Sequence, residues 1–388
     1  MNRKTFISLL GGGIVLAAGA GVAAVAIGSR MPASATASWR DASGEADLRR
    51  FVLAHALLAP NPHNMQPWIA DLSVADSIAL RLDPARLLPA TDPFGRQILM
   101  GAGAFLELLA MAAAARGHRT DITLFPAGDP GERLDGRVFA HVRLVADAAI
   151  PPDPLFAQVL ARRTDRRAYD PARPVSTVEA TSLRAAAGGA VRFGLAGGDD
   201  ATRLARIRTI VREAWRLELI TPDTMMESMR VLRVGGAEID RHRDGIAITS
   251  PLLFALAKLG LLDRGVAPAP DSTAVKQQIA DFDAITAATP AFLWIVTEGN
   301  RREQQIAAGR AFARVALAGT AMGLVMHPNE QSLQEYKEVA GPYHAIHDLL
   351  EAPTPRFTVQ MLARLGALPQ GVAAAGPAPR RGLAALLA

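Results

Sequence analysis

Apolar residues along this chain repeat with two periods, which predict a few long helices and several short strands. A spacing of three to four residues predicts helices over 45–58, 92–117, 201–219 and 304–323. Runs with strand-like composition predict strands at 68–72, 77–82, 122–125, 139–145, 292–299, 324–329 and 357–366. Strands and helices therefore alternate in both halves of the chain, and residues 148–154, AAIPPDP, are the predicted linker between them.

The two long helices rich in small residues share a pattern. Gln97-Ile98-x-x-Gly101 recurs 208 residues later as Gln305-Ile306-x-x-Gly309, and each helix precedes a short apolar segment that ends in proline. Alanine-rich helices can resemble each other by chance, but the order strand, helix, strand is also the same in both halves. The chain is therefore predicted to contain an internal duplication.

The first 37 residues are predicted to be an export signal or a membrane anchor. Arg3 and Lys4 precede about 25 uncharged residues, 5–29, which are long enough to span a bilayer. NRKTF resembles a twin-arginine export signal with Lys4 in place of the second arginine, and small residues at 33–37 offer cleavage sites. The twin-arginine route carries folded proteins, so it suits a cofactor loaded before export. The protein is therefore predicted to be periplasmic or otherwise exported, either free or anchored to the inner membrane.

The formal charge of +5 does not indicate a nucleic-acid partner. Only four of the 42 basic residues are lysines, a skew typical of genome composition, and no basic run is interleaved with aromatic residues. The chain has no cysteine, which excludes disulfides, thiolate metal sites and a cysteine nucleophile. His344 and His347 lie three residues apart, but no third ligand is marked, so no metal site is predicted.

Residues 59–68, APNPHNMQPW, form a loop of unusual composition. Its three prolines forbid a continuing helix and a central strand, and they stiffen the chain. Asn64 and Gln66 can donate and accept hydrogen bonds at the edge of a heterocycle that carries alternating C=O and N–H groups. The alternative is a structural turn around a buried tryptophan.

Four arginines and a threonine crowd into residues 162–167, RRTDRR, which the pattern places at the start of a helix. Guanidinium groups bind phosphate in a bidentate manner, a helix N-terminus adds amide donors, and Thr164 adds a hydroxyl. A second pair, Arg380 and Arg381, lies near the C-terminus. The sequence predicts one phosphate site if the fold brings the chain ends together, and the alternative is an ordinary solvated patch.

Together, the loop and the arginine segment resemble the motifs of the nitroreductase family. APNPHNMQPW resembles the family's A-P-S-x-x-N-x-Q-P-W loop, RRTDRRAY its opening R-R-S-x-R-x-F, and PRRGL its closing basic motif. Asn61 and Thr164 stand where the family usually has serine. The order of segments over residues 45–388 is similar to that of the single-chain, tandem-domain members of the family.

The resemblance implies an α+β fold in which two sheet-and-helix halves form an intramolecular pseudo-dimer. Family members bind FMN between two subunits, with the arginines from one subunit and the amide loop from the other. Here residues 38–150 carry the loop and residues 151–388 carry the arginine motifs, so one complete FMN site is expected in a monomer. A lid insertion is expected at about 220–275.

The resemblance also implies roles for the matched residues. The residues expected to hold the phosphate are Arg162, Arg163, Thr164, Arg380 and Arg381. The side chains expected to contact the flavin ring or its ribityl chain are Asn61, Asn64 and Gln66. Arg166 would lie near N1 and C2=O of the ring, and the backbone at His327 and Pro328 would approach N5 and O4. No side-chain acid or base is expected, because the flavin carries out the chemistry.

The predicted function is an exported FMN-dependent oxidoreductase that reduces nitro- or quinone-like acceptors. Its electron donor would be NAD(P)H, which is scarce outside the cytoplasm, or a membrane carrier. One alternative is a flavin-binding or flavin-sequestering protein whose lid blocks the site. A membrane-anchored structural protein without cofactor is a further alternative, but it would leave the pairing of arginines with amides unexplained.

Overall fold

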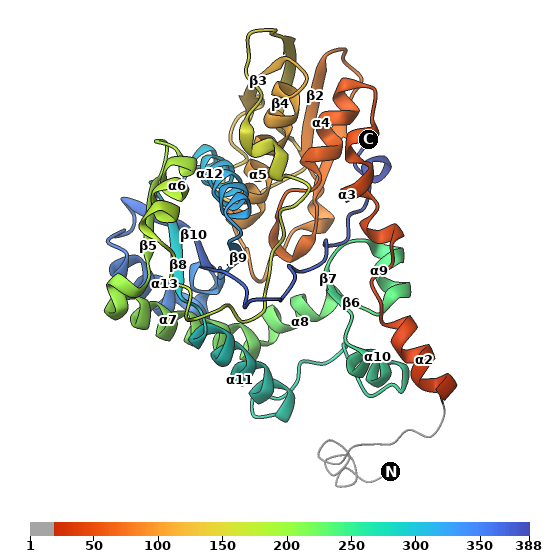
Figure 1. Cartoon of the computed structure of the whole chain (residues 1–388), viewed down its shortest axis with the longest axis vertical. Helices are drawn as coiled ribbons and strands as arrows, with labels where there is room; N and C mark the ends of the chain where they lie inside the picture. Colours follow the sequence, from red (N-terminus) through yellow and green to blue (C-terminus); the bar gives the residue numbers. More distant parts are fainter. Residues whose placement is uncertain (1–18) are drawn as a thin grey trace.

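Two halves, each a four-stranded antiparallel sheet with helices, make up the computed structural model, which describes residues 19–388 and side chains from residue 24 onward (Figure 1). The elements of the first half are α2 (Gly19–Gly28), α3 (Ser38–Asp41), α4 (Leu48–Ala56), β1 (Trp68–Asp71), β2 (Ser77–Leu82), α5 (Arg96–Ala114), β3 (His118–Leu124) and β4 (Val138–Ala146). The elements of the second half are α6 (Thr177–Ala187), β5 (Arg192–Ala196), α7 (Ala201–Ile220), α8 (Pro222–Arg230), β6 (Leu232–Val234), α9 (Gly236–His242), β7 (Ile246–Ile248), α10 (Pro251–Lys258), α11 (Thr273–Ala287), β8 (Ala291–Glu298), α12 (Arg302–Ala321), β9 (Val325–Pro328), α13 (Ala340–Leu349) and β10 (Phe357–Gly366). Residues 1–18 of the predicted export signal lie outside the described residues.

The two sheets have the same topology. Their strand orders are β1-β2-β4-β3 and β5-β8-β10-β9, and every pairing within them is antiparallel. In chain order, α4, β1, β2, α5, β3 and β4 correspond to α6, β5, β8, α12, β9 and β10. The predicted α+β fold with two sheet-and-helix halves is confirmed, and the repeat seen in the two helices extends to whole sheets.

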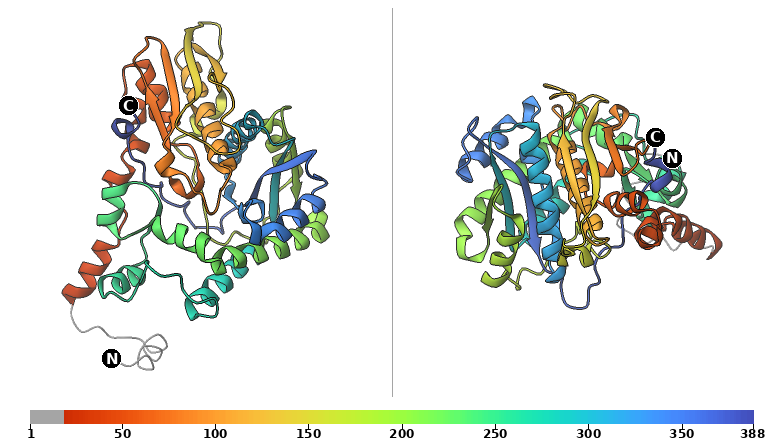
Figure 2. Two further views of the ribbon diagram at one scale, coloured as in Figure 1. Left: turned by 180° about the vertical axis from the view of Figure 1, so that it is seen from behind. Right: turned by 90° about the horizontal axis from the view of Figure 1, so that it is seen from above.

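The halves meet along α5 and α12, which lie side by side at the centre of the molecule (Figures 1 and 2). Glycines bring the two backbones into contact: a Cβ on Gly103 would lie 2.1 Å from the carbonyl oxygen of Ile306. Likewise, a Cβ on Gly309 would lie 2.0 Å from the carbonyl oxygen of Met100. Since these distances are far below van der Waals contact, only glycine fits. Gly103 and Gly309 therefore lie at the interface of the two halves, whereas Gly101, which corresponds to Gly309 in the repeat, faces Asn61.

Helix α5 is a core helix of the protein. Among the described residues, it is the helix that is long and apolar enough to cross a membrane, but 94% of that stretch is buried within the protein. Its first turn begins at Gly95, and the Asp92 carboxylate accepts hydrogen bonds from the backbone N–H groups of Gln97 and Ile98. This carboxylate satisfies amides that have no partner inside the helix.

Residues 162–170 lie outside any helix, so the predicted helix start at 162–167 is wrong. Thr164 forms a parallel bridge with Met326, and the backbone N–H of Asp165 donates to the carbonyl of Met326 at 3.1 Å. This pairing with β9, some 160 residues away in sequence, overrides the local helical pattern. The amide donors and dipole of a helix N-terminus are consequently absent from the arginine segment.

The long connection between β5 and β8 reaches back across the first half. It includes the predicted insertion at 220–275, which forms α8, β6, α9, β7 and α10 (Figure 1). Glu227 on α8 accepts hydrogen bonds from the backbone of Ala90 and Thr91, and Asp244 pairs with Arg86 at 2.6 Å. The insertion is therefore an arm clamped to the first half.

The chain ends meet on the first half. The backbone N–H of Arg380 donates to the carbonyl of Ala35 at 2.9 Å, and the last residue, Ala388, donates to Ala70. The C-terminal tail thus crosses from the second half to the first, as the blue trace in Figure 1 shows. The fold therefore allows Arg162 and Arg163 to share one site with Arg380 and Arg381, as the predicted phosphate site requires.

Candidate functional site

The amide loop has a strained backbone. Three of its non-glycine residues have positive φ angles: His63 at 45°, Asn64 at 53° and Gln66 at 48°. This region is unfavourable for residues that have a Cβ, and proteins keep such conformations mostly where a ligand or an active site requires them. The strained backbone agrees with the prediction that this loop takes part in a binding site.

The three predicted amides hold the loop in shape. Asn61 accepts from the backbone N–H of Gln66 at 2.9 Å and donates to the carbonyl of Ala59. Gln66 donates to the carbonyls of Asn64 and Arg243, which ties the loop to the arm. Both ends of each amide are satisfied within the protein, so their predicted contact with a ring stays a prediction.

The C-terminal arginines are bound to the same loop. The Asn64 amide donates to the carbonyl of Pro379 and accepts from Arg380 at 2.8 Å. Arg380 is 3% exposed and also donates to the carbonyls of Leu57, Leu58 and Ala59 beyond the end of α4. The Arg381 backbone N–H donates to the Gln66 side chain at 2.9 Å. These arginines therefore join the tail to the loop, and their predicted contact with phosphate stays a prediction.

Three guanidinium groups surround the indole of Trp39. The guanidinium carbons of Arg162, Arg163 and Arg380 lie 5.8, 4.5 and 5.0 Å from its ring centroid. The indole N–H donates to the carbonyl of Ala378 at 2.8 Å, which fixes the ring beside the tail. The structure thus brings residues 162 and 163 together with residue 380, although they are more than 200 positions apart.

This arginine cluster has no acidic partner within residues 19–388. No salt bridge involves Arg162, Arg163 or Arg380, and burial together with the neighbouring arginines lowers the pKa of Arg162 to about 10 and that of Arg380 to about 9. Arg162 is 5% exposed, and its Nε has no hydrogen-bond partner in the described part of the chain. Burial of uncompensated charge is costly, so the cluster fits an anion with several oxygen acceptors.

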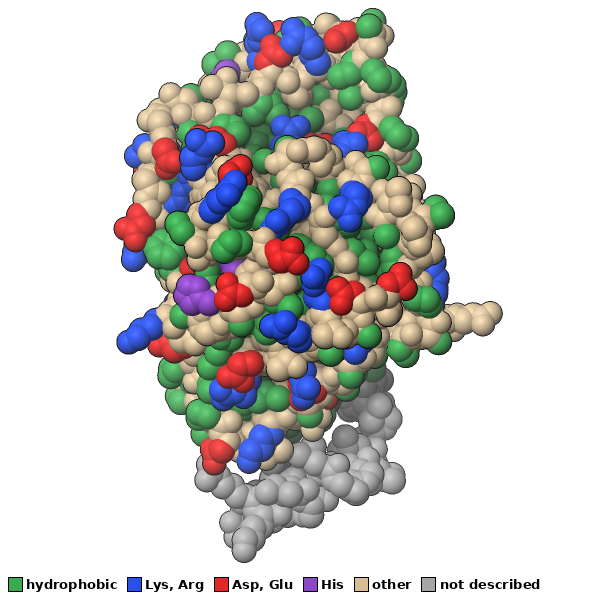
Figure 3. Space-filling model, turned by 90° about the vertical axis from the view of Figure 1, so that its left-hand side faces the viewer, with side chains coloured by type: hydrophobic (Ala, Val, Ile, Leu, Met, Phe, Trp, Pro, Cys, Tyr) green, Lys and Arg blue, Asp and Glu red, His purple; other side chains and the backbone are tan. Residues whose placement is uncertain are grey.

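Donors remain free for such an anion. Arg163 is half-buried, and among the described residues it uses only Nη1, in hydrogen bonds to the carbonyls of Leu160 and Arg162. The Thr164 hydroxyl accepts a long hydrogen bond from Arg162 at 3.5 Å and keeps its own hydrogen available. On the face shown in Figure 3, basic and acidic side chains are interspersed. In the cluster, by contrast, three arginines lie together without a salt-bridge partner among the described residues.

A second group of charged residues gathers around Arg166. Its positive charge helps to lower the pKa of His63 to about 4 and that of His327 well below its usual range, with burial as the main cause in both. Arg364 is fully buried in β10 and donates to the carbonyl of Arg166 at 3.0 Å and to Nδ1 of His327 at 3.1 Å. Arg364 also lies over the ring of Tyr169 at 4.5 Å. Arg166 therefore sits between the amide loop and β9.

These side chains come from both halves of the molecule: His63 belongs to the amide loop, and Arg166 and His327 belong to the second half. Arg166 is exposed to solvent, and His63 and His327 are half-buried. Pro328 follows His327 in β9 and pairs with Ala363 of β10. The backbone that was predicted to approach the flavin ring therefore lies next to His327.

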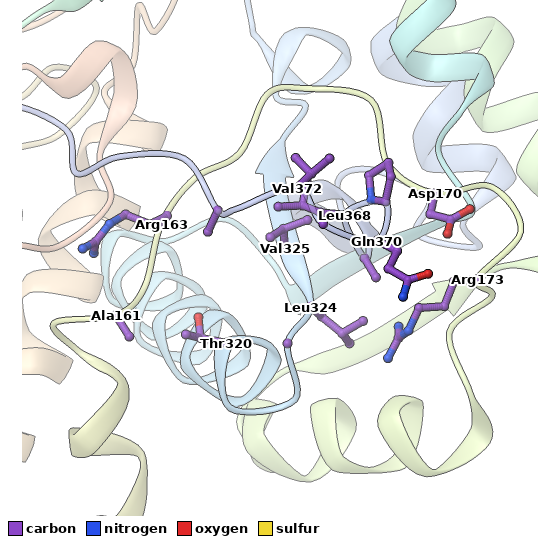
Figure 4. Close-up of a pocket in the computed structure, with 15 residues that line it drawn as sticks. Ala161, Arg163, Asp170, Arg173, Thr320, Leu324, Val325, Leu368, Gln370 and Val372 are labelled. Atoms are coloured by element: carbon purple, nitrogen blue, oxygen red, sulfur yellow. The ribbon is translucent and has the colours of Figure 1, made fainter.

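A separate cavity of about 530 Å³ lies beside this site (Figure 4). It is lined by the C-terminal end of α12, the start of β9 and the tail at 367–374, with Arg173 and Asp170 on its rim. Of the predicted site residues it includes only Arg163, whose side chain points away from the others toward the N-terminal segment in Figure 4. The cavity is therefore a neighbour of the arginine cluster.

His347 is a structural residue rather than half of a metal site. Its Nδ1 lies 2.7 Å from the carbonyl of Tyr343, and its Nε2 accepts from the backbone N–H of Val359 at 3.0 Å. Both ring nitrogens are engaged and the ring is 1% exposed, so the neutral form is required. Within residues 19–388 no group of three or more potential metal ligands occurs.

Replacing His347 with glutamine is expected to weaken the loss of stability in acid. Burial lowers the pKa of His347 to about 4, below its unfolded value of 6.5. Protonation therefore favours the unfolded chain, and this effect is absent above pH 6.5 and grows as the pH falls toward 4. Between pH 7 and pH 4.5 the wild type should lose about 1–2 kcal/mol more unfolding free energy than His347→Gln. Urea unfolding at both pH values measures the difference, and equal losses would contradict this role.

Sequence patterns did not indicate three residues of the site. Trp39 lies just after the predicted export signal, in a segment without a recognisable motif. Arg364 lies in an otherwise apolar strand, and His63 occupies a variable position of the loop motif. A charged residue in an apolar strand is a usable signal, because burial of arginine needs partners. The contact of Trp39 with the arginines depends on the meeting of the chain ends and leaves no local signal.

Relatives of known name provide an independent comparison. The chain is 30% identical over 348 residues to the Mycobacterium tuberculosis protein named "Putative NAD(P)H nitroreductase Rv3131", covering 87% of this chain and 90% of that protein. It is 35% identical over 127 residues to "Putative NAD(P)H nitroreductase acg" of the same organism, covering 31% of this chain and 35% of that protein. No model of a known protein family matches the chain.

Solved structures resemble the chain only in part. A Bacteroides fragilis nitroreductase with bound FMN aligns with 59% of this chain and 96% of its own, at 12% identity and a TM-score of 0.36. The FMN-dependent nitroreductase NfnB of Mycobacterium smegmatis, in complex with NADPH, aligns with 59% and 94%, at 17% identity and a TM-score of 0.35. TM-scores this low do not support a family assignment. The assignment therefore rests on the relatives found by sequence. Because the similarity to Rv3131 extends over most of both chains, this chain belongs to the nitroreductase family.

Proposed function

We propose that the chain is an FMN-dependent oxidoreductase of the nitroreductase type, with a single flavin site where its two halves meet. The observation that carries the proposal is the cluster of Arg162, Arg163 and Arg380 around Trp39, which has no acidic partner among the described residues. A flavin nucleotide ends in a phosphate that would supply the missing negative charge. Since the two halves take the place of two subunits, the protein would act as a monomer.

Two parts of the site would hold the two ends of the cofactor. Arg162, Arg163 and Thr164 would bind the phosphate through their free donors. At the other end, Arg166 would provide one positive charge beside the flavin ring, and the neutral rings of His63 and His327 would add none at pH 7. The chemistry that a bound FMN would supply there is hydride uptake and electron delivery to an acceptor.

The amide loop would serve as the rigid wall of this site. Its hydrogen bonds to Arg243, Pro379 and Arg380 are made within the protein and hold three strained residues in place. Such preorganisation lowers the entropy that binding would otherwise cost. We propose nitro- or quinone-like compounds as acceptors and NAD(P)H, which appears in the names of the relatives, as the donor.

The proposal includes an exported protein that stays attached to the inner membrane by a twin-arginine-type N-terminus. The segment just before residue 38 belongs to the folded body: the Ser34 hydroxyl donates to Asp240 at 2.7 Å, and the carbonyl of the fully buried Ala35 accepts from Arg380. Cleavage after Ala35 or Ala37 would remove these contacts, which supports an anchor over a cleaved signal. A carrier in the membrane would then be an accessible alternative donor.

Anaerobic addition of NADPH to the flavin-loaded full chain tests the enzymatic proposal. The flavin absorbance near 450 nm is expected to bleach within seconds to minutes and to return when a quinone or nitro compound is added. A flavin that stays oxidised with NADPH and with a reduced quinone, yet is reduced by dithionite, would contradict the oxidoreductase. That result would favour the flavin-sequestering alternative, with the arm acting as its lid.

A further inference from the structure

Helix α10 is an apolar helix that the protein covers only in part: residues 253–257 are half-buried, and residues 251, 252 and 258 are exposed. Seven of its eight residues, PLLFALAK, are apolar, and none of the eight is buried. The sequence continues with Leu259, Leu261 and Leu262, so that 251–262 carry one charge, on Lys258. The core strand β8, by contrast, buries seven of its eight residues. A helix of this composition is normally covered on at least one side.

Exposed hydrophobic side chains gather at this end of the molecule. Within the part of the chain whose side chains are described, eight large hydrophobic residues are strongly exposed, and five of them lie at the end of α2 or between 252 and 266. Their exposed fractions are 65% for Ile27, 56% for Leu252, 70% for Leu259, 51% for Leu261 and 66% for Val266. Scattered exposed hydrophobics are ordinary, but a contiguous group indicates an interaction surface.

The same surface lies beside the N-terminal apolar segment. Helix α2 packs on α10, where a Cβ on Gly28 would lie 2.6 Å from the ring of Phe254. Figures 1 and 2 show the two helices side by side, projecting from the end opposite β3 and β4. Residues 5–29 contain no charge, and their last part is α2. The stretch long enough to span a bilayer therefore joins the body at α10.

The charges around this surface suit an interface with lipid. Arg30 and Lys258 are exposed beside it, and the Lys258 ammonium lies 5.5 Å from the ring centroid of Phe254. A lysine over an apolar helix can keep its stem among acyl chains and its charge among head groups. The other charges nearby are Asp263, which is exposed, and Arg264, which pairs with Glu238 at 2.6 Å.

We propose that α10 and the following residues to Val266 lie in the surface of the lipid bilayer, next to the N-terminal anchor. The helix is apolar, short and bounded by charges, which is typical of a segment that enters the interface without crossing it. The inference rests on the anchor in the proposed function and is independent of the flavin chemistry. Bilayer contact at two adjacent points would fix the orientation of the body on the membrane.

Fluorescent probes on the full chain test this surface, since the protein has no cysteine of its own. Single variants Leu259→Cys and Leu261→Cys carry an environment-sensitive label, and Val178→Cys and Val74→Cys are the controls, with exposed fractions of 75% and 59%. The vesicles contain phosphatidylcholine and phosphatidylglycerol, with a nitroxide on part of the acyl chains. Labels at 259 and 261 are expected to shift to shorter wavelength and to be quenched at least twofold, with both controls unchanged.

Each other outcome contradicts the inference in a distinct way. If the chain floats with the vesicles but labels at 259 and 261 stay water-like, the anchor holds and the α10 surface does not touch lipid. If the chain does not float, the anchor fails as well. If these labels are already shifted without vesicles and the chain elutes as a dimer, a second copy covers the surface. Flavin content of the four variants is recorded separately, so failure here leaves the flavin proposal intact.

Discussion

Replacing Arg96 with alanine is expected to lower the free energy of unfolding by about 3–5 kcal/mol. Arg96 lies in the first turn of α5 and is 1% exposed. Its guanidinium pairs with Glu330 at 3.2 Å and with Glu335 at 3.6 Å, and it donates to the carbonyls of Leu333 and Gln360. All four partners belong to the second half, so the substitution removes a link between the halves and leaves two carboxyl groups without their cation. Chemical unfolding at pH 8 measures the loss.

The loss should also depend on pH. Burial raises the pKa of Glu330 to about 7, and Arg96 opposes this shift. Without Arg96 the folded-state pKa rises further above the unfolded value of 4.5, so the folded protein gains by holding the proton. That gain is present at low pH and is lost as the pH rises through the folded pKa. The variant should therefore lose less stability at pH 6 than at pH 8.

A surface ion pair provides the control. Arg356 pairs with Glu298 at 3.3 Å, but their side chains are 73% and 70% exposed. Arg356→Ala is expected to cost less than about 1 kcal/mol, because water and salt screen an exposed pair. If Arg96→Ala costs no more than Arg356→Ala, the buried pair does not join the halves as the contacts indicate.

Replacing Arg166 with glutamine is expected to weaken FMN binding by about 10- to 100-fold, the value of one charge-assisted interaction. Arg166 has no acidic partner in the described part of the chain, and its charge helps to lower the pKa of His63 in the amide loop and of His327 in β9. The midpoint potential of the bound flavin should also fall by about 30 mV or more, since the lost charge stabilises the reduced state by at least ~1.4 kcal/mol. Fluorescence titration and a spectroelectrochemical titration measure the two effects.

The neighbouring arginine serves as a matched control. Arg167 is 48% exposed and pairs with the buried Asp165, to which its Nε donates at 2.9 Å. It has the same charge and lies one residue away, but its charge is already compensated. In Arg167→Gln, Asp165 keeps its hydrogen bonds from the backbone N–H groups of residue 167 and Ala375, and the glutamine amide can donate to it as well. FMN affinity should therefore stay within about twofold of the wild type, and the midpoint potential within about 10 mV. Equal effects of the two substitutions would show that general positive charge, rather than the position of Arg166, is responsible.

Much of the fold could be predicted from local patterns. The strand at 292–299 is almost wholly buried and the one at 77–82 alternates, and both signals depend only on nearby residues. The repeat of Gln97 and Gly101 at Gln305 and Gly309 indicated the duplication, although only Gly309 of the two glycines lies at the contact between the helices, and Gly101 faces Asn61. The matching strand orders of the two sheets follow from that duplication.

The sequence predicted which residues belong to the site better than it predicted how they are arranged. The sequence could name the arginines and the amide loop, but the extended form of 162–167 depends on pairing with Met326, which no local pattern shows. The amides were expected to face a ring, and the structure has them holding the loop and the tail together. Trp39 is placed by its contact with Ala378, more than 300 residues away in sequence. Arg364 is placed by its contact with Arg166, about 200 residues away. Long-range packing of this kind cannot be derived from periodicity.

Flavin content of the full chain, purified in detergent and saturated with FMN, tests the central claim most directly. The extracted flavin, quantified by absorbance and identified by chromatography against FMN and FAD, is compared with the protein concentration from amino-acid analysis. One composite site between two halves predicts close to one FMN per chain. Absence of flavin after saturation would contradict a flavin site altogether, and two FMN per chain would contradict a single site shared by the two halves.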